Sequence, residues 1–408
     1  MSKMRLFAVI AAVALALTSC GGSSGPTTKG SGSTKGGNGA AATGFTPPKL
    51  TALEKLGTPE KALNIVAWAG YAEDGSTDPK VDWVTPFEKA TGCQVNVKNG
   101  TTSDDMVALM KTGQYDVVSA SGDASLRMIA SGDVEPVNTD LVPNYADVFD
   151  ALKMKPWNSV NGVAYGIPHG RGANLLMYRT DKVSPPPTSW SVVFDKASPY
   201  KGLVTAYDSP IYIADAAVYL MSTRPDLKIK NPFALDDKQF AASIDLLKKQ
   251  NADVGEYWSD YTKEITAFKN GDSVVGTTWQ IIANLAQADK APVEALLPSE
   301  GATGWSDTWM VATKSKHKTC AYKWMDWIIS PKVNAEVAEW FGEAPSNRKA
   351  CAQTADKNFC TTFHASDEAY FDQVWYWTTP ITACLDGRTN VKCKDYGAWT
   401  AAWQQIKG

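Results

Sequence analysis

The hydrophobic and polar positions between residues 59 and 120 switch repeatedly between the strand period and the helix period. Apolar runs at residues 63–68 and 115–119, and an alternating segment at residues 93–97, are typical of strands. Residues 78–92 and 103–110 lie between them, and each begins with helix-start residues followed by apolar positions at helical spacing. Strand, helix, strand, helix, strand at these lengths predicts a parallel α/β unit.

The pattern changes after residue 160. Residues 163–178 form an extended stretch interrupted by Gly166-Ile167-Pro168-His169-Gly170-Arg171-Gly172, which we interpret as a crossover between two lobes. Beyond it, strands are predicted at residues 202–208, 273–277 and 293–297, and helices at residues 214–221, 236–250, 257–268, 320–341 (a pair) and 396–406. The chain therefore alternates strands and helices through most of its length, as α/β proteins do.

Polar and aromatic residues follow several of these strands directly. They are Trp68 to Tyr71, Ser121 to Asp123, Asp208 and Trp279. In open α/β sheets, ligands bind at the carboxyl ends of strands. These positions are therefore candidates for a binding site.

The stretch Gly304-Trp305-Ser306-Asp307-Thr308-Trp309 carries the most distinctive chemistry of the chain. On an extended strand, the two-residue spacing of Trp305 and Asp307 places both side chains on one face. An indole face beside a carboxylate is a receptor for a cation, because the ring quadrupole and the negative charge both attract an ammonium group. The alternative is that the tryptophans are core residues and that Asp307 caps a turn.

Composition narrows the choice of partner. The chain has 408 residues, enough for two domains, a formal net charge of -3 and 20% charged residues. The chain has no excess of basic residues, which argues against nucleic acid as its main partner. The fifteen tryptophans equal the fifteen tyrosines in number, which is more indole than a core usually needs, so some are expected to line a binding surface.

Seven cysteines indicate the redox compartment. Cys20 stands apart from the rest, and the other six are Cys93, Cys320, Cys351, Cys360, Cys384 and Cys393. No two have the C-x-x-C spacing and the chain has three histidines, so disulfides in an oxidising compartment are favoured over a zinc site. Six cysteines pair in fifteen ways. Pairing 351 with 360 and 384 with 393 would close two short loops and leave 93 with 320, but the sequence leaves the connectivity open.

The N-terminus reads as an export signal. Lys3 and Arg5 precede an apolar run, residues 6–17, that is too short to span a bilayer comfortably. It ends in Leu17-Thr18-Ser19-Cys20, which resembles the lipobox of bacterial lipoproteins and implies cleavage before Cys20 and lipidation of that cysteine. An ordinary signal peptide with a chance cysteine is the alternative. Residues 21–58, rich in Gly, Ser and Thr at their start, are expected to be a flexible tether.

Several strings along the chain resemble the substrate-binding proteins of spermidine/putrescine ABC importers. They match over residues 63–341 in order and are closest to the YdcS-like branch of the extracellular solute-binding proteins. The strings are Trp68-Ala69-Gly70-Tyr71, Asp82-Trp83-Val84, Asp116-Val117-Val118, Ala120-Ser121-Gly122-Asp123-Ala124-Ser125-Leu126, Tyr207-Asp208-Ser209-Pro210-Ile211-Tyr212-Ile213-Ala214-Asp215, Trp279, Trp305-Ser306-Asp307 and Cys320-Ala321-Tyr322-Lys323-Trp324-Met325.

The resemblance implies a fold and a site. The fold is the type II periplasmic-binding-protein fold, two α/β lobes that each carry a mixed sheet flanked by helices, with the ligand in the cleft between them. We assign residues 59–168 and 305–345 to the N-terminal lobe, and residues 169–304 and 346–408 to the C-terminal lobe. The implied ligand-binding residues are Trp68, Tyr71, Ser121, Asp123, Asp208, Trp279, Trp305, Asp307 and Glu343.

Three positions depart from the family pattern. Asp123 stands where an aromatic residue is usual, Ile211 where a second carboxylate is usual, and Glu343 where a tyrosine is usual. The cationic character of the ligand survives these changes, while its length does not follow from them. As alternatives, Trp68 is a plain core residue, and Asp123 and Glu343 are surface carboxylates.

We therefore expect a monomeric protein outside the cytoplasm, held to the membrane by its lipid, that captures a small cationic amine for an ABC permease. No cofactor, metal or nucleic acid is expected. A sugar or quaternary-amine binder, a cell-surface hydrolase and an adhesive lipoprotein are the alternatives. A glycosidase would need two carboxylates at a fixed separation, which the sequence does not exclude.

Overall fold

The computed structural model describes residues 45–195 and 198–408. The expected signal peptide, Cys20 and most of the expected tether lie outside the described residues. Residues 45–58 of that tether contain no helix or strand. Among the helices described, none has the length and apolar character needed to cross a membrane.

The first of two five-stranded sheets has the order β2-β1-β3-β14-β6. Strands β1 (Ala62–Ala67), β2 (Gln94–Asn99) and β3 (Val117–Ala120) are parallel, and β14 (Thr308–Val311) and β6 (Ile167–Pro168) extend the sheet in antiparallel pairs. Helices α1 (Val84–Thr91), α2 (Ser103–Lys111), α3 (Gly122–Ser131) and α9 (Lys318–Ile328) pack around it. The parallel β/α unit predicted for residues 59–120 is therefore confirmed.

The second five-stranded sheet has the order β10-β9-β11-β8-β12. Its strands are β8 (Leu175–Arg179), β9 (Val204–Tyr207), β10 (Val254–Trp258), β11 (Val275–Thr278) and β12 (Val293–Leu296). Its helices are α4 (Ser191–Phe194), α5 (Ile213–Thr223), α6 (Asp237–Gln250), α7 (Tyr261–Asn270), α8 (Gln280–Ala288) and α13 (Tyr396–Lys407). This sheet is also mixed, because β8 runs antiparallel to both β11 and β12.

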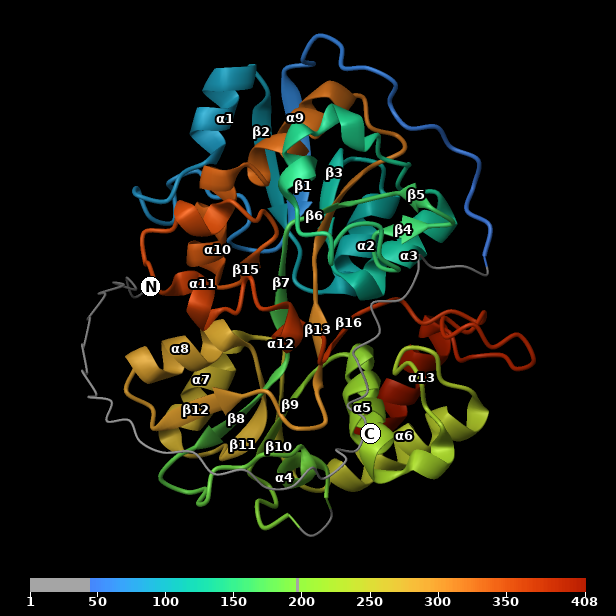
Figure 1. Cartoon of the computed structure of the whole chain (residues 1–408), viewed down its shortest axis with the longest axis vertical. Coiled ribbons are helices and arrows are strands. Elements are labelled where there is room, and N and C mark those ends of the chain that lie inside the picture. The colour runs from blue at the N-terminus through green and yellow to red at the C-terminus, as the bar shows by residue number, and fades with distance from the viewer. Residues whose placement is uncertain (1–44, 196–197) are drawn as a thin grey trace, which may run out of the picture. The chain divides into compact units, whose positions relative to one another are not determined.

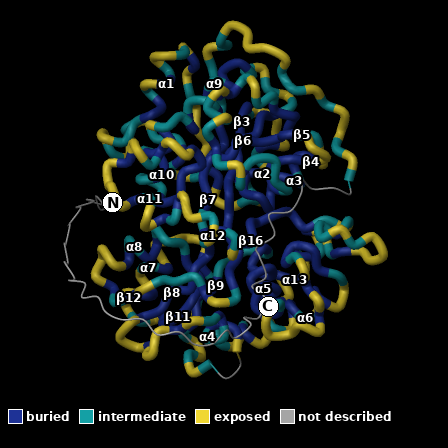
Figure 2. The backbone as a smooth tube through the Cα atoms, in the orientation of Figure 1, coloured by how far each residue is buried: buried dark blue, intermediate teal, exposed yellow. Residues whose placement is uncertain are grey.

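A third, four-stranded sheet, β15-β7-β13-β16, joins the other two (Figure 1). It consists of β7 (Gly170–Ala173), β13 (Ala302–Trp305), β15 (Ala344–Pro345) and β16 (Val374–Tyr376). Figure 1 shows β7 and β13 running from the region of the first sheet to that of the second. Figure 2 shows these strands as mostly buried, and Gly172 of β7 is half-buried. The extended stretch that was predicted to cross between lobes is therefore a pair of short strands, β6 and β7, followed by β8.

The remaining elements connect these layers. They are α10 (Pro331–Phe341), α11 (Phe359–Thr362), α12 (Glu368–Phe371), the hairpin strands β4 (Ser159–Val160) and β5 (Val163–Ala164), and the 3-10 turns Thr139–Leu141, Pro143–Asp147, Pro210–Tyr212, Pro225–Leu227 and Ala350–Ala352. Helices α9 and α10 follow each other in the chain, which confirms the helix pair predicted for residues 320–341.

Two helix boundaries predicted from the sequence are wrong. Tyr257 was placed at the start of a helix, but it lies in β10, and the helix starts at Tyr261 behind the Asp260 cap. Residues 78–83 do not belong to α1, which starts at Val84. In both cases, aromatic and apolar residues at helical spacing fill tertiary contacts instead, so the local pattern overstated the helix.

The six described cysteines form three disulfides. Cys93 pairs with Cys320, Cys351 with Cys360, and Cys384 with Cys393. This is the arrangement with two short loops, which the sequence had left open among fifteen. The Cys93–Cys320 bond ties the residue before β2 to α9, two elements on the first sheet.

Candidate ligand-binding site

Asp307 occupies the junction between the first sheet and the crossing strands. Its neighbour Thr308 pairs with Ala120 on one side and with Pro168 on the other. This register brings Asp307 beside the residues that follow those two positions, Ser121 and His169. Their two-residue spacing predicted that Trp305 and Asp307 lie on one extended strand. This is wrong, because Trp305 ends β13, Thr308 begins β14 and Asp307 lies between the two strands. Both residues are nevertheless buried, with 4% and 3% of their surfaces exposed.

Four residues from distant parts of the chain form one buried acidic cluster. The Ser121 hydroxyl lies 2.6 Å from Asp307 Oδ1. The Tyr71 hydroxyl oxygen lies 2.8 Å from Asp307 Oδ2 and 3.1 Å from Glu343 Oε2. We call Tyr71, Ser121, Asp307 and Glu343 the acid cluster. All four were site residues expected from the sequence, and the fold brings them into contact although as many as 272 positions separate them.

Local structure explains how each residue is held there. Ser121 occupies the N-cap position of α3, directly after β3. Tyr71 follows β1 in a turn, and its carbonyl accepts a hydrogen bond from the Trp83 indole at 3.1 Å. Glu343 comes after Gly342, which ends α10 in the left-handed conformation that favours glycine. Each side chain therefore starts from the end of a helix or strand, where the backbone is fixed.

His169 supports the cluster as a neutral ring. Burial lowers the pKa of His169 to about 3. Its Nδ1 accepts a hydrogen bond from the Trp309 indole at 3.0 Å, so the ring proton is on Nε2. Nε2 lies 3.3 Å from Glu343 Oε1, yet neither atom completes a hydrogen bond in the described structure. Glu343 therefore keeps an unmet acceptor, and the nearby histidine does not neutralise it.

The buried carboxyl groups of this region form no ion pair with a charged basic side chain in the described part of the chain. Burial raises the pKa of Asp307 to about 6, against the hydrogen bonds from Ser121 and Tyr71. Burial also raises the pKa of Asp123, which accepts from the Ser103 hydroxyl, to about 6. For Glu343, burial and then the charge of Asp307 raise the pKa well above its usual range. Among the described residues, no lysine or arginine forms an ion pair with any of these three carboxyl groups.

Close backbone approach makes room for the cluster. A Cβ placed on Gly170 would lie 2.3 Å from the Glu343 carboxyl carbon, and one on Gly172 would lie 2.5 Å from the Trp305 ring. Both glycines are in β7. These two glycines belong to the stretch that was interpreted as a crossover. Because they have no side chain, Glu343 and Trp305 can pack directly against β7.

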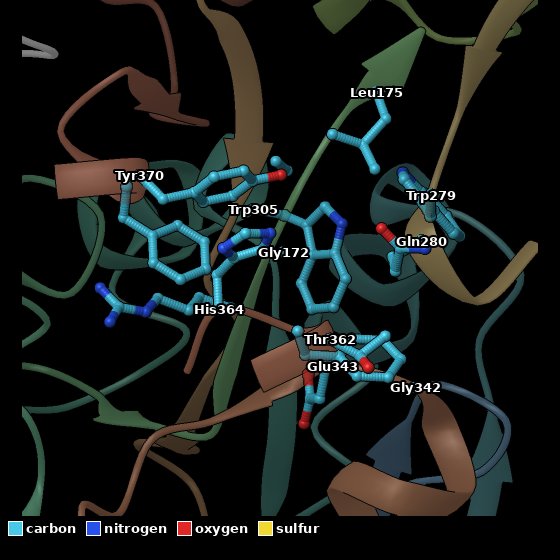
Figure 3. Close-up of a pocket in the computed structure, with 14 residues that line it drawn as sticks. Gly172, Leu175, Trp279, Gln280, Trp305, Gly342, Glu343, Thr362, His364 and Tyr370 are labelled. Atoms are coloured by element: carbon cyan, nitrogen blue, oxygen red, sulfur yellow. The ribbon is translucent and has the colours of Figure 1, made fainter. Parts of the chain in front are cut away.

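Aromatic rings extend the site from the acid cluster toward the second sheet. Trp305 meets Phe341 edge-on at 5.9 Å and Trp279 at 6.1 Å, and Phe341 in turn meets Tyr71 at 4.4 Å between ring centroids. Trp279, Trp305 and Glu343 line one pocket, and Figure 3 shows Trp305 with Trp279 and Gln280 toward one side and His364 and Tyr370 toward the other. The cavity is about 20 Å³, room for about one water molecule.

A buried hydrogen-bond relay, absent from the sequence-based site, holds Trp279. The Trp279 indole donates to Asn174 Oδ1 at 2.9 Å, and Asn174 Nδ2 lies 2.6 Å from the Thr303 hydroxyl. That hydroxyl donates to Asp215 Oδ1 at 2.8 Å. Burial raises the pKa of Asp215 to about 7. The relay fixes the orientation of one aromatic wall from α5 and the crossing strands.

Asp208 and Trp68 lie differently from the other expected site residues. Both oxygens of Asp208 lie 2.7 Å from the Lys407 ammonium, and the Trp403 indole donates to Oδ1 at 3.1 Å. Helix α13 of this chain therefore supplies the cation that Asp208 attracts. Trp68 is half-buried beside the core of the first sheet, and its indole N–H has no partner in the described structure.

Sequence reasoning missed His169, Phe341 and the relay residues. His169 and Phe341 stood within stretches that the sequence marked as a crossover and a helix end, which drew no attention to their side chains. Asp215 lay in a string already quoted for the family resemblance, but the acid at the strand end, Asp208, was chosen instead. Nothing in the sequence around Asp215 indicates that its buried carboxyl group accepts a hydrogen bond from Thr303.

Comparison with known proteins agrees with this architecture. The family model described as bacterial extracellular solute-binding protein matches residues 82–362. The spermidine/putrescine-binding periplasmic protein of Escherichia coli K12 is 26% identical over 301 residues, covering 71% of this chain and 83% of the relative. The putrescine/cadaverine-binding protein of Pseudomonas aeruginosa is 24% identical over 317 residues, covering 72% of this chain and 81% of the relative.

The fold is shared with a solved structure as well. A spermidine/putrescine ABC transporter substrate-binding protein from Streptococcus pneumoniae superimposes with a TM-score of 0.65 at 17% identity, covering 85% of this chain and 97% of the other. The predicted type II periplasmic-binding-protein fold is thereby confirmed.

Proposed function

Because the chain belongs to the family of bacterial extracellular solute-binding proteins, we propose that it captures a polyamine such as putrescine or spermidine, or a related cationic amine, and delivers it to the permease of an ABC importer. The acid cluster is the observation that carries this proposal. Asp307 and Glu343 are buried together without a basic partner in the described structure, which costs several kcal/mol that a bound cation would offset. Catalysis is not part of the proposal.

The hydrogen-bonding needs of the site favour an amine with N–H groups. Among the described residues, none donates a hydrogen bond to Glu343 Oε1, and an ammonium group would supply one along with its charge. A quaternary amine has no N–H to give. A sugar would bring hydroxyl donors but leave the carboxylates without a counter-charge. The faces of Trp279 and Trp305 would pack against the methylene chain of the amine and add about 0.5–2 kcal/mol each where they meet the cation.

Ligand entry requires the site to open. The cavity of about 20 Å³ has no room for an alkyl diamine, and Asp307, Glu343 and Trp305 are buried. We propose that residues 59–168 and 305–345 form one lobe, that residues 169–304 and 346–408 form the other, and that they separate about β7 and β13. Closure over the amine would exclude water and strengthen its ion pairs.

We further propose that the protein is a monomer anchored outside the cytoplasm by lipid on Cys20. The relatives in Escherichia coli are periplasmic by name, and the lipobox-like end of the N-terminal apolar run supports the anchor. Labelling cells with a radioactive fatty acid tests this. Wild-type protein should carry the label and sediment with membranes, whereas Cys20→Ser should lose the label and be released. Size-exclusion chromatography with light scattering tests the monomer.

A thermal-shift and calorimetry series tests the ligand. Purified protein is titrated with putrescine, cadaverine, spermidine, glycine betaine and a maltooligosaccharide. A cationic amine at a hundred times its Kd should stabilise the fold by about 2.7 kcal/mol and raise the Tm accordingly. A response to glycine betaine or to the sugar alone would refute the proposal in favour of those classes.

A further inference from the structure

One phenolic hydroxyl stands between two carboxyl groups. The oxygen of Tyr71 lies 2.8 Å from Asp307 Oδ2 and 3.1 Å from Glu343 Oε2, both within hydrogen-bonding distance. A phenol has one proton and donates it to one acceptor. The second contact therefore needs a carboxylic acid O–H that donates to the phenol oxygen, because two lone pairs would otherwise face each other. The geometry places one proton on this pair of carboxyl groups beyond the proton of Tyr71 itself.

The surrounding donors decide which carboxyl group holds that proton. Asp307 has the shorter contact to Tyr71 and also accepts from Ser121 at 2.6 Å, so its charge is stabilised by two donors. Glu343 has no such second donor within residues 45–195 and 198–408. Burial, followed by the charge of Asp307, raises the pKa of Glu343 well above its usual range. Both observations assign the proton to Glu343.

The other charged and titratable groups around Glu343 do not change this assignment. His169 is neutral, and its Nε2–H faces Oε1 at 3.3 Å without completing a hydrogen bond. Asp123 adds negative charge near Asp307. The other charged or titratable side chains that line the same pocket are those of Arg171, His364 and Tyr370. The Arg171 guanidinium is engaged by Glu368 at 2.7 Å and by the Ala365 carbonyl at 3.0 Å, so it does not neutralise Glu343.

We infer that Glu343 is a neutral acid in the ligand-free protein and that a bound ammonium group displaces its proton to solvent. In this exchange the carboxylic O–H bond breaks, the proton leaves to water or buffer, and an N–H of the ligand becomes the donor to the carboxylate. The ligand keeps its charge. The inference rests on the proposed function and adds that amine binding is an exchange of one cation for another, so that affinity depends on pH.

The sign of that dependence follows from linkage. If each ligand displaces one proton, affinity rises by about tenfold per pH unit while Glu343 is neutral in the free protein. Alkyl amines resemble lysine, with a pKa of about 10.4, so the ligand is charged throughout pH 7 to 8. Burial raises the pKa of Asp307 and of Asp123 to about 6, which leaves both ionised at pH 8. A proton that the acid cluster releases at pH 8 therefore comes from Glu343.

Calorimetry with putrescine at pH 8 in two buffers of different ionisation enthalpy, Tris and phosphate, counts that proton. We expect wild type to release close to one proton per ligand and Glu343→Gln, which keeps a donor to Tyr71 at nearly the same size, to release almost none. Glu264→Gln is the matched control, because Glu264 is a buried glutamate of α7, outside the acid cluster, and burial likewise raises its pKa well above the usual range. It should release as wild type does. Binding without proton release in wild type, or equal release in Glu343→Gln, would overturn the inference.

Infrared difference spectroscopy decides the same question without relying on amine binding. Ligand-free wild type minus ligand-free Glu343→Gln should show the carbonyl band of a neutral carboxylic acid. Identical spectra would overturn the inference. If no amine binds in calorimetry, the proposed function fails while this spectrum still decides the state of Glu343. Should the glutamine variant fold poorly, the loss of the acid band on adding putrescine to wild type takes its place, and an unchanged band counts against the exchange.

Discussion

Two carboxylates that the sequence treated alike meet opposite surroundings. Asp307 lies in the acid cluster, where its donors are the neutral hydroxyls of Ser121 and Tyr71. Asp208 lies at the end of β9, where Lys407 brings an ammonium to within 2.7 Å of both its oxygens. In the part of the chain that the structure describes, no basic side chain pairs with Asp307, whereas Lys407 pairs with Asp208. A carboxylate at a strand end is therefore available to a ligand only if the rest of the chain leaves it unpaired.

Burial separates the two regions energetically. Asp307 and Glu343 are 3% and 1% exposed, whereas the side chains of Asp208 and Lys407 are 26% and 34% exposed. An ion pair near the surface contributes about 0–1 kcal/mol. Unpaired buried carboxyl groups cost much more, and the protein lowers that cost by keeping them protonated or by binding a cation. The acid cluster destabilises the ligand-free protein relative to the ligand-bound protein. The Asp208–Lys407 pair has no such effect.

The largest expected effect is on the pH dependence of stability. Because burial raises the pKa of Asp307 from the unfolded value near 3.9 to about 6, the folded state binds more protons than the unfolded state in that window. The free energy of unfolding contributed by this group falls on the order of 2 kcal/mol as pH rises from 4 to above 6. Without ligand, the Tm of wild type should therefore fall when the pH is raised from 4.5 to 7, relative to the Tm of Asp307→Asn over the same range. Asn96→Ala, an exposed substitution on β2, should behave as wild type. Parallel curves for wild type and Asp307→Asn would contradict the prediction.

The next effect sharpens the contrast between the two acids in binding. Asp307→Asn removes the charge that would face the amine, and we expect the Kd for putrescine to rise tenfold or more, at least about 1.4 kcal/mol. Asp208→Asn should change the Kd by less than about threefold, because Lys407 already holds that carboxylate. Isothermal titration of both variants measures this. Equal losses of affinity in the two variants would show that Asp208 also binds the ligand and that its ion pair with Lys407 breaks on binding.

A smaller effect concerns the relay behind Trp279. Asn174→Ala removes the acceptor of the Trp279 indole, so the ring loses its fixed orientation and the Kd should rise by about threefold to tenfold, on the order of 1 kcal/mol. In a Trp279→Phe background the ring has no N–H to donate, and Asn174→Ala should then cost little. A double-mutant cycle measures the difference. Additive losses would mean that Asn174 supports the fold alone and not the tryptophan.

The smallest effect is expected at the surface pair. Lys407→Ala frees Asp208 and should lower the free energy of unfolding by at most about 1 kcal/mol, less at high salt. Urea unfolding at low and at high salt measures this. A loss well above that size would show that α13 depends on the pair far more than its exposure allows.

The local sequence was sufficient to place the three parallel strands of the first sheet and to indicate the family. Apolar runs and caps placed β1 to β3 because hydrophobic periodicity and capping act over a few residues. The same reasoning failed at Tyr257, where a strand of the second sheet begins what looked like a helix. Strand or helix at such a point is decided by the neighbouring strand, β9, which lies far away in the chain.

What the sequence determined by itself is the inventory: an α/β chain with a family signature, six cysteines besides Cys20, and a surplus of indoles and acids at strand ends. What only the tertiary structure decided is which acid is left without a cation. Asp208 meets Lys407 across 199 positions, and Tyr71 meets Glu343 across 272. Contacts at such separations depend on sheet register and helix packing, which no short window of residues encodes. The availability of a charge for a ligand is a property of the folded surroundings and not of the residue type.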